Sequence, residues 1–318
     1  MNDQTHNTWL IGSGPMAVAY VEVLKAMNLE MIIVGRGEAS SEACYEATGI
    51  KPVTGGLGPF LEAKPVIPDT AIVAVGVEQL FPVSMALLRY GVKKILVEKP
   101  GAVSLEEIKT LNQEAKDCGA EVYLGYNRRY YASTQQALKM IEEDGGITSF
   151  VFEFTEWSHK IEPLQKGPGV KEKWFLANST HVADLAFFVG GLPENIDCNV
   201  AGGLSWHPSG SVFSGSGKTD KGALFAYHAD WTSAGRWACE FLTKKHRYIL
   251  KPLEELKIQK TGSIAVEDVE LDDALDKEFK PGLYKQVEDF LENTPKYLPT
   301  IAEQEKMGHT YYSMANYN

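Results

Sequence analysis

The chain has 318 residues, of which 44% belong to the hydrophobic set and 23% are charged, and its formal net charge is -11. This composition is typical of a globular protein, and the length suits two domains better than one core. The negative net charge, with basic residues scattered along the chain, argues against nucleic acid as a partner.

The cysteines and the amino terminus limit the choice of compartment. Cys44, Cys118, Cys198 and Cys239 lie far apart, without a Cys-x-x-Cys pair or histidines at metal-ligand spacing, so we expect reduced thiols and no metal site. The start of the chain lacks a basic stretch followed by an apolar one, and no segment approaches the ~20 apolar residues of a membrane span. We therefore expect a cytoplasmic location and no membrane partner.

The first half of the chain alternates short apolar strands with helices. Strands are expected at 9–11, 31–34, 71–75 and 95–97, and helices at 18–27, 43–48 and 81–90. This alternation predicts an α/β fold with a doubly wound parallel sheet of the Rossmann type. Ligands of such sheets bind beyond the carboxyl ends of the strands.

A glycine turn follows the first strand, with the sequence Gly12-Ser13-Gly14-Pro15-Met16-Ala17. Gly12 permits a tight turn, Gly14 lets the backbone approach a pyrophosphate, and Ala17 is the small third position. The helix that begins near Pro15 directs its N–H groups and positive dipole end at the phosphates. The place of this turn between strand and helix predicts that Gly12, Gly14, Pro15 and Met16 bind a dinucleotide.

The ends of the second and third strands supply further cofactor-binding candidates, Arg36 and Gly76. Folds that bind NAD usually carry an acidic residue at the end of the second strand, whereas an arginine suits the 2′-phosphate of NADP. We therefore expect NADP in preference to NAD. Glu38 could instead reach the ribose hydroxyls, and an arginine after a strand is common on protein surfaces.

Glu98-Lys99-Pro100 follows the buried run 95–97. A lysine at the carboxyl edge of a parallel sheet points towards bound cofactor or substrate. The alternative is an ordinary surface charge before a turn proline.

These motifs, together with Gly125-Tyr126-Asn127-Arg128-Arg129-Tyr130 and His181-x-x-Asp184, resemble those of the Gfo/Idh/MocA family of oxidoreductases. The resemblance covers nearly the whole chain. It implies a dinucleotide-binding Rossmann domain over residues 1–125, with Glu98 and Lys99 at the cofactor. It also implies a substrate-binding and oligomerisation domain of α+β type over residues 126–318, with a large, mainly antiparallel open sheet.

The second half of the chain agrees with this expectation. Aromatic-rich strands are expected at 150–154, 222–227, 237–242 and 246–250, and helices at 180–189 and 302–317. The glycine-rich segment 211–218 lacks the spacing of a phosphate loop and is interpreted as a hairpin turn. A broad sheet with one face not covered by helices predicts a homodimer or homotetramer through that face.

Hydride transfer from a carbinol carbon also requires movement of the hydroxyl proton, so the site needs an acid or base. The resemblance implies that Lys99 and His181 are catalytic, with Lys99 bonded to the reacting oxygen and His181 exchanging its proton. Histidine titrates near neutral pH, and burial can bring a lysine into range. A helix histidine that bonds a backbone carbonyl is the structural alternative for His181.

Six residues are candidates for contact with the substrate: Asn127, Arg128, Trp174, Asn178, Asp184 and Arg236. A tryptophan face stacks on a sugar ring, and an arginine suits a carboxylate or phosphate. Alternatively, Arg128 pairs with a carboxylate and the tryptophans belong to the core. The predicted function is NAD(P)-dependent hydride transfer between nicotinamide and a hydroxyl-bearing carbon of a sugar, sugar acid, polyol or nucleotide sugar.

One position departs from the family pattern. Many catalytic members carry an aspartate four residues before the histidine, where this chain has Ala177. Asn178 could bond a sugar hydroxyl, but it cannot act as a base. A catalytically quiet NAD(P)-binding sensor or scaffold is therefore the alternative. An eliminase or hydrolase that recycles its cofactor also stays open, because the family includes such chemistry.

Overall fold

The computed structural model describes residues 7–317. The amino-terminal stretch that predicts a cytoplasmic location lies, except for Asn7, outside the described residues. Contacts within the chain divide it into two units. One contains Met1–Tyr126 and Leu283–Lys306, and the other contains Asn127–Gly282 and Met307–Asn318.

The first unit is built on a five-stranded sheet. Its strands are β1 (Asn7–Ile11), β2 (Glu30–Val34), β3 (Thr70–Val73), β4 (Lys94–Glu98) and β5 (Glu121–Gly125). They lie in the order β2-β1-β3-β4-β5 and all pair in parallel. The residues of β3 are all buried, as expected of a parallel strand covered on both faces. The strand order reverses between β1 and β3, so the carboxyl ends of these strands flank the point where α/β sheets bind ligands.

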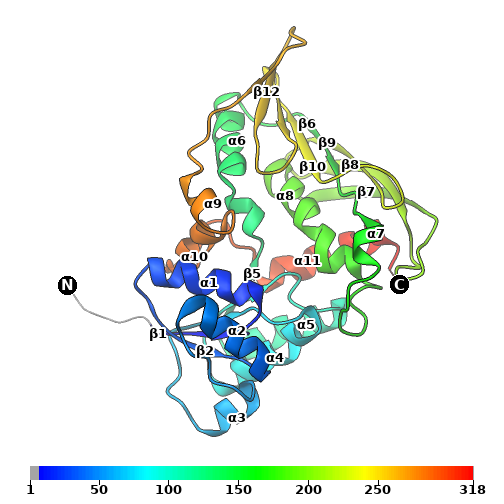
Figure 1. Cartoon of the computed structure of the whole chain (residues 1–318). Coiled ribbons are helices and arrows are strands. Elements are labelled where there is room, and N and C mark those ends of the chain that lie inside the picture. The colour runs from blue at the N-terminus through cyan, green and yellow to red at the C-terminus, as the bar shows by residue number, and fades with distance from the viewer. Residues whose placement is uncertain (1–6, 318) are drawn as a thin grey trace. The chain divides into compact units, whose positions relative to one another are not determined.

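Helices connect these strands (Figure 1). They are α1 (Pro15–Ala26), α2 (Glu38–Thr48), α3 (Leu57–Glu62), α4 (Val77–Tyr90) and α5 (Leu105–Asp117), joined from far along the chain by α10 (Leu283–Leu291). Local sequence signals set their ends. Gly91 ends α4 in the left-handed region, with φ of 111°, and a capping box between Ser104 and Glu107 begins α5. Helix α10 contacts α1. The predicted doubly wound parallel sheet is confirmed.

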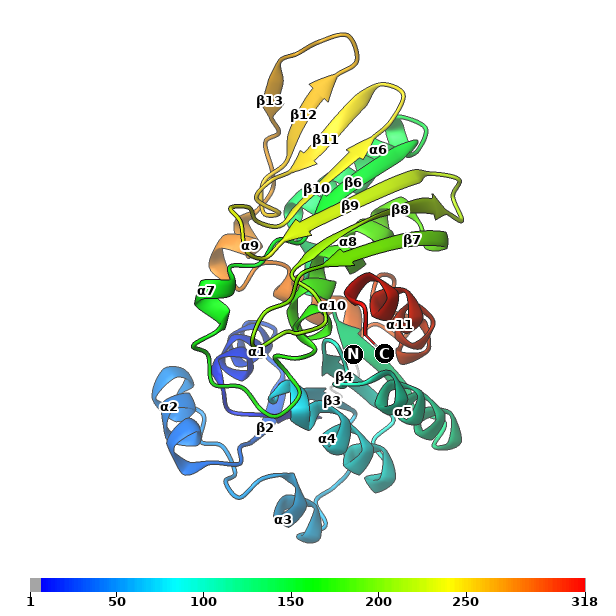
Figure 2. The same ribbon diagram turned by 90° about the vertical axis from the view of Figure 1, so that its right-hand side faces the viewer.

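The second unit is built on an eight-stranded sheet. Its strands are β6 (Ser149–Glu153), β7 (Pro193–Ala201), β8 (Val212–Thr219), β9 (Leu224–Asp230), β10 (Ala238–Leu242), β11 (His246–Leu250), β12 (Lys257–Lys260) and β13 (Val266–Asp268). Their order is β13-β12-β11-β10-β6-β9-β8-β7 (Figure 2). Only β6 and β9 pair in parallel. This confirms the predicted mainly antiparallel sheet and the predicted fold class.

Helices cover one face of this sheet. The unit contains α6 (Ala132–Glu143), α7 (Ser158–Ile161), α8 (Thr180–Gly190), α9 (Ala274–Glu278) and the second half of α11 (Ile301–Ala315). It also contains a 3₁₀ turn (Asn127–Tyr130) and a π-helical turn (Phe175–Ser179). Helix α8 packs on β6 and β10, and α6 packs on β11. Burial alternates along β9, so the opposite face of the sheet is exposed, with Val151 at 40% and Leu224 at 62% of their full accessibility. Among residues 7–317, no helix has the length and apolar character to cross a membrane.

Phenylalanine side chains form the centre of the core in the second unit. Phe150 of β6 is 1% exposed; its ring stacks on Phe225 at 5.4 Å between centroids and meets Phe187 of α8 edge-on at 6.2 Å. The helix approaches this cluster closely at Gly190, where a Cβ would lie 2.2 Å from the Phe150 ring. Close packing of α8 on the sheet therefore depends on the missing side chain.

The prediction of a hairpin turn at 211–218 is wrong, because these residues form most of β8. Two glycines of this strand face aromatic rings of β9. A Cβ at Gly215 would lie 2.5 Å from the Tyr227 ring, and one at Gly217 would lie 2.7 Å from the Phe225 ring. Glycine in a strand interior usually marks such a close approach. Here it makes room for aromatic side chains rather than for a turn.

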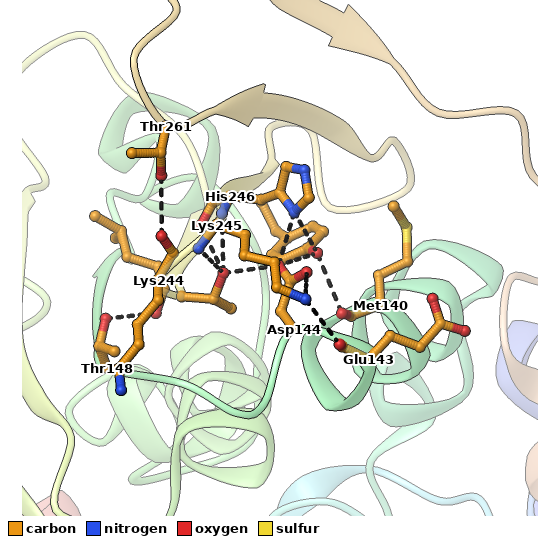
Figure 3. Close-up of polar contacts among 11 residues, drawn as sticks. Met140, Glu143, Asp144, Thr148, Lys244, Lys245, His246 and Thr261 are labelled. Atoms are coloured by element: carbon orange, nitrogen blue, oxygen red, sulfur yellow. Dashed lines mark hydrogen bonds and ion pairs between the residues drawn. The ribbon is translucent and has the colours of Figure 1, made fainter.

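A polar cluster around Asp144 joins α6 to β11 (Figure 3). Oδ2 of Asp144, directly after α6, accepts hydrogen bonds from the hydroxyls of Thr243 and Tyr248, each at 2.7 Å, and lies 2.7 Å from Nδ1 of His246. Burial acts to raise the pKa of Asp144, but these hydrogen bonds and the His246 imidazole outweigh it, so the pKa lies below its usual value. The cluster therefore holds a carboxylate rather than a carboxylic acid.

Candidate functional site

The turn between β1 and α1 forms a cradle of backbone. Gly12 has φ of +128°, and a Cβ there would lie 2.3 Å from the carbonyl oxygen of Ala74, so only glycine fits. Gly14 has no atom within 4 Å of its Cβ position, so a ligand can approach its backbone. Pro15 and Met16 begin α1, whose N-cap makes no side-chain hydrogen bond. The N–H groups of this first turn fit the pyrophosphate of a dinucleotide.

The end of β2 offers both a cation and an acid. Arg36 is exposed and forms no ion pair with the residues that the structure describes. Glu38 begins α2 and is also exposed. The Ser13 hydroxyl of the glycine turn lies 2.9 Å from the Ser40 hydroxyl, which ties α2 to the cradle. Either Arg36 or Glu38 could therefore meet the ribose of an adenosine at this edge.

Gly76 lies beyond the end of β3, where it is the N-cap of α4. A Cβ at this position would lie 2.6 Å from Oε1 of Glu78, so the glycine leaves room for that carboxylate. The backbone N–H of Gln79 donates to the Gly76 carbonyl at 2.8 Å, which closes the first turn. Gly76 thus lies in the loop after β3, the strand that pairs with β1 where the strand order reverses.

Glu98 ends β4 and is anchored by α1. Its Oε1 accepts a 2.7 Å hydrogen bond from the hydroxyl of Tyr20, which in turn accepts one of 2.9 Å from Nε2 of Gln286 in α10. Burial, followed by the charge of Glu98, raises the pKa of Tyr20 well above its usual value, so its hydroxyl remains a donor. Lys99 comes next and is half-buried. The N–H of Gly101 donates to the Glu98 carbonyl at 3.0 Å, which closes the turn that carries Lys99.

The predicted cofactor-binding residues thus lie at one edge of the first sheet. They follow the carboxyl ends of β1, β2, β3 and β4, in turns that the glycines make possible. Their contact with a cofactor stays a prediction.

In the second unit, three predicted site residues surround one indole, that of Trp237. The guanidinium carbons of Arg236 and Arg128 lie 4.5 and 4.8 Å from its ring centroid, within the range of cation–π contact. The His181 imidazole lies 6.1 Å away between centroids. Trp237 is 6% and His181 7% exposed. The sequence identified the three basic residues but not the ring that they share.

A buried carboxylate, Glu156, joins two more of the predicted residues. Its Oε1 accepts hydrogen bonds of 2.8 Å from both Nδ2 of Asn178 and the hydroxyl of Ser179, and its Oε2 accepts one of 3.2 Å from Nη1 of Arg236. The Glu156 side chain is 2% exposed. Burial raises the pKa of Glu156, although the hydrogen bonds and the charge of Arg236 oppose this. Glu156 was not among the predicted site residues, although its place just after the apolar strand β6 could have indicated it.

The π-helical turn Phe175–Ser179 carries Asn178 into this network. Turns of this kind are frequent at functional sites. The backbone N–H of Phe175 donates to the Tyr317 hydroxyl at 3.0 Å, and that hydroxyl lies 2.7 Å from Nε2 of His207. Tyr317 therefore holds the start of the turn and Glu156 holds its end. His181 follows in the first turn of α8.

Asn127 and Asp184 bind neighbours in the same unit. Nδ2 of Asn127 donates to the Pro281 carbonyl at 2.8 Å, and its Oδ1 accepts from Nη1 of Arg128 at 3.1 Å, so Asn127 orients that guanidinium. Asp184 accepts a bidentate ion pair from Arg129, with bonds of 2.6 and 2.8 Å. This pair ties α8 to the 3₁₀ turn.

Trp174, the remaining predicted substrate residue, precedes the π-helical turn. Its side chain is 7% exposed and meets Trp206 edge-on, with 6.1 Å between ring centroids. These contacts place Trp174 in the aromatic core of the second unit.

Comparison with known families agrees with the architecture of the first unit. Residues 7–126 match the Gfo/Idh/MocA family model, which describes an oxidoreductase family with an NAD-binding Rossmann fold. No protein of curated function matches the chain.

Several solved structures share the fold of the whole chain. An oxidoreductase from Agrobacterium radiobacter in complex with NAD+, L-tartaric acid and magnesium has a TM-score of 0.79 at 15% identity, covering 99% of this chain and 96% of that one. Levoglucosan dehydrogenase in complex with NADH and levoglucosan has a TM-score of 0.78 at 18% identity, with coverage of 99% and 97%. UDP-N-acetylglucosamine 3-dehydrogenase from Acidithiobacillus ferrooxidans has a TM-score of 0.73 at 14% identity, with coverage of 98% and 97%. At these identities the likeness shows the fold.

Proposed function

We propose that this protein is an NAD(P)-dependent dehydrogenase or reductase, because residues 7–126 match the model of the Gfo/Idh/MocA oxidoreductase family with its NAD-binding Rossmann fold. Its substrate is a sugar, sugar acid, polyol or nucleotide sugar that reacts at a hydroxyl-bearing carbon. The observation that carries the proposal is the cradle at Gly12 and Gly14, which leaves backbone N–H groups and open space where a pyrophosphate would bind.

The cofactor is held by the predicted residues of the first unit. Gly12, Gly14, Pro15 and Met16 bind the pyrophosphate, and Gly76 and Glu98 line the same edge of the sheet. When bound, the nicotinamide supplies the centre that gives or takes the hydride. The anchored Glu98 fixes the direction in which Lys99 leaves β4.

Lys99 and His181 handle the proton of the reacting hydroxyl. Lys99 hydrogen-bonds the substrate oxygen, and the imidazole of His181 exchanges the proton with it. An imidazole can accept or donate a proton, which suits either direction of the reaction. The indole of Trp237 packs beside His181 and restricts the orientation of its ring.

NADP is the preferred cofactor in this proposal. The support is Arg36, an exposed guanidinium at the end of β2 without an ion pair among the described residues. The similar Agrobacterium radiobacter oxidoreductase and levoglucosan dehydrogenase structures contain NAD+ and NADH. If this protein binds NAD(H), Glu38 is the residue that would receive the ribose hydroxyls.

The substrate class is proposed from the second unit and from the related structures. Levoglucosan dehydrogenase and UDP-N-acetylglucosamine 3-dehydrogenase act on carbohydrates by their names. The second unit supplies Arg128, Asn178 and Arg236 as polar groups around Trp237 and Glu156. Such a mixture of an aromatic ring and oriented donors suits a polyhydroxylated ligand.

Turnover assays test the proposal directly. The purified protein is incubated with NADP(H) or NAD(H) and a panel of sugars, polyols, sugar acids and nucleotide sugars, and absorbance at 340 nm is followed. We expect turnover with at least one class, and NADPH binding by fluorescence in the absence of substrate. A folded protein that binds neither reduced cofactor contradicts the proposal.

A second candidate function rests on Ala177, which replaces the aspartate of many catalytic relatives. In this case the protein binds NAD(P) as a sensor or scaffold without turnover. Cofactor binding with no turnover on any member of the panel would favour it. Product analysis by mass spectrometry with catalytic amounts of cofactor separates both from an eliminase or hydrolase that regenerates its cofactor.

The proposal includes a cytoplasmic location and a homodimer or homotetramer. All four cysteines are unpaired, as in proteins of reducing compartments. The face of the second sheet opposite α6 and α8 exposes Val151 and Leu224, which supports self-association through that face.

A further inference from the structure

The guanidinium of Arg236 is in contact with two indole rings. Its guanidinium carbon lies 4.5 Å from the ring centroid of Trp237 and 4.9 Å from that of Trp157. Nε1 of Trp157 donates to the Gly235 carbonyl at 2.9 Å, which fixes the second ring against the backbone beside Arg236. A guanidinium in contact with two indole rings loses part of the freedom that a surface arginine normally has.

Glu156 binds one edge of the same guanidinium. Nη1 of Arg236 donates to its Oε2 at 3.2 Å, and Glu156 is the only hydrogen-bond partner of Arg236 among residues 7–317. The carboxylate is itself fixed by Asn178 and Ser179. The Arg236 side chain is 44% exposed, whereas that of Glu156 is 2% exposed. Arginine has five N–H donors, so the exposed edge keeps donors in a fork that matches a carboxylate or phosphate.

The surroundings of this edge favour an anion. Arg128 stacks on the same indole as Arg236, and His181 lies beside it. Glu153, whose carboxylate lies against the backbone of Gly235, is paired with Lys251 at 3.5 Å. Nε1 of Trp237 is buried and makes no hydrogen bond with the described residues, so one more donor stands unused in the cluster. A ligand oxygen would supply the partner that the Trp237 N–H lacks among the described residues.

We propose that Arg236, in contact with the indoles of Trp157 and Trp237 and held by Glu156, is the subsite for an oxyanion of the substrate. The inference rests on the proposed function and narrows it: the substrate is a sugar acid, sugar phosphate or nucleotide sugar rather than a neutral sugar or polyol. The oxyanion binds at Arg236, while the reacting hydroxyl binds near His181, which lies beside the same indole.

The test measures binding rather than turnover, so that failure of catalysis does not decide it. Isothermal titration calorimetry of the full chain, with and without NADPH, uses D-gluconate, D-glucose 6-phosphate and UDP-glucose as anionic probes and D-glucose and xylitol as neutral ones. We expect at least one anionic probe to bind about tenfold or more tightly than its neutral counterpart. Which anion binds best separates a carboxylate from a phosphate source.

Two substitutions locate the effect. Arg236→Gln should weaken the best anionic probe by about 10- to 100-fold, as expected when a charge-assisted, two-bond contact is lost, and should leave neutral probes within about twofold. Arg236→Lys keeps the charge but not the forked pair of donors, so its affinity for the anionic probe should lie between those of the wild-type protein and Arg236→Gln. Arg247→Gln is the matched control, because Arg247 pairs with Glu240 on the same sheet away from this stack.

Three outcomes overturn the proposal. One is no preference of the wild-type protein for anionic probes, and another is an equal loss of anionic and neutral binding in Arg236→Gln. The third is the absence of saturable binding of every anionic probe to a protein whose thermal unfolding is normal. Lack of NAD(P)-dependent turnover together with anion binding that depends on Arg236 would refute the proposed function and leave the subsite intact.

Discussion

The hydroxyl of Tyr20 in α1 donates a 2.7 Å hydrogen bond to the carboxylate of Glu98 at the end of β4. This bond links the helix of the glycine turn to the strand that leads to Lys99, although the two residues lie 78 positions apart. This contact therefore fixes the position of the glycine turn relative to the turn that carries Lys99, the two parts of the proposed cofactor site.

Tyr20→Phe tests this link. Removal of one charge-assisted hydrogen bond in the buried site should lower the free energy of unfolding by about 1–3 kcal/mol. Turnover should fall because Glu98, the residue before Lys99, is no longer held in place by Tyr20. The Kd for NADPH should change less. Urea unfolding and steady-state kinetics measure the two effects. Tyr45→Phe, at an exposed tyrosine of α2, is the control, and equal effects in both variants would count against the link.

Lys99→Ala tests the proposed catalytic role of the lysine. Loss of the group that bonds the reacting oxygen should lower kcat by about 10²- to 10⁴-fold, with little change in cofactor affinity. Lys109→Ala, which removes an exposed lysine of α5 paired with Glu106, should behave as wild type. A near-normal kcat in Lys99→Ala would remove this residue from the mechanism.

Arg36→Ala tests the cofactor preference. Without the guanidinium, the Kd for NADPH should rise by about tenfold or more while the Kd for NADH changes little. Fluorescence titration of both reduced cofactors measures this, with Arg89→Ala, an exposed arginine paired with Glu114, as the control. If the wild-type protein binds NADH more tightly, Glu38→Gln becomes the informative variant and NADP preference is refuted.

Asp144→Asn tests the polar cluster beneath β11. The folded protein lowers the pKa of Asp144, so the carboxylate stabilises the fold above its unfolded pKa of about 3.9, and this stability is lost as the pH falls towards the folded pKa. The variant should therefore lose roughly 1–3 kcal/mol of unfolding free energy at pH 7, and the difference from wild type should shrink below about pH 4. Thermal unfolding across pH checks this. Glu142→Gln, on the exposed side of α6, should show neither effect.

Val151→Lys tests self-association. A charge in the middle of the exposed sheet face should shift the proposed oligomer towards monomer, because its burial in an interface would be costly. Multi-angle light scattering gives the mass, and Ile264→Lys, at a fully exposed position between β12 and β13, is the control. A wild-type protein that is already monomeric would refute the oligomer.

Local signals in the sequence predicted the first unit well. Buried runs such as 95–97 and the glycines at 12 and 91 each impose one local structure, and the parallel sheet follows from their alternation. The strands of the second unit were harder to predict from the sequence. Strand β8 was missed because Gly215 and Gly217 are turn formers by type. Their place in a strand is explained by the close approach of the β7 backbone and of the Tyr227 and Phe225 rings, which a local pattern does not reveal.

The candidate site, too, could be predicted only where local sequence patterns identify its residues. Arg236 and His181 were identified by type and motif, but Glu156 and Trp237 were not, because their importance depends on neighbours far along the chain. The bidentate contact of Arg129 with Asp184, 55 residues away, likewise could not be read from a local pattern.

Tyr317 has a practical consequence for anyone who handles this protein. Its hydroxyl accepts a hydrogen bond from the N–H of Phe175 and lies 2.7 Å from Nε2 of His207, so a residue just beyond α11 steadies the turn that carries Asn178. Removal of this tyrosine, or a bulky fusion placed directly against it, would loosen the turn that carries Asn178. Affinity labels and fluorophores for binding studies are therefore better attached through the exposed hairpin around Ile264, where 97% of the side chain meets solvent.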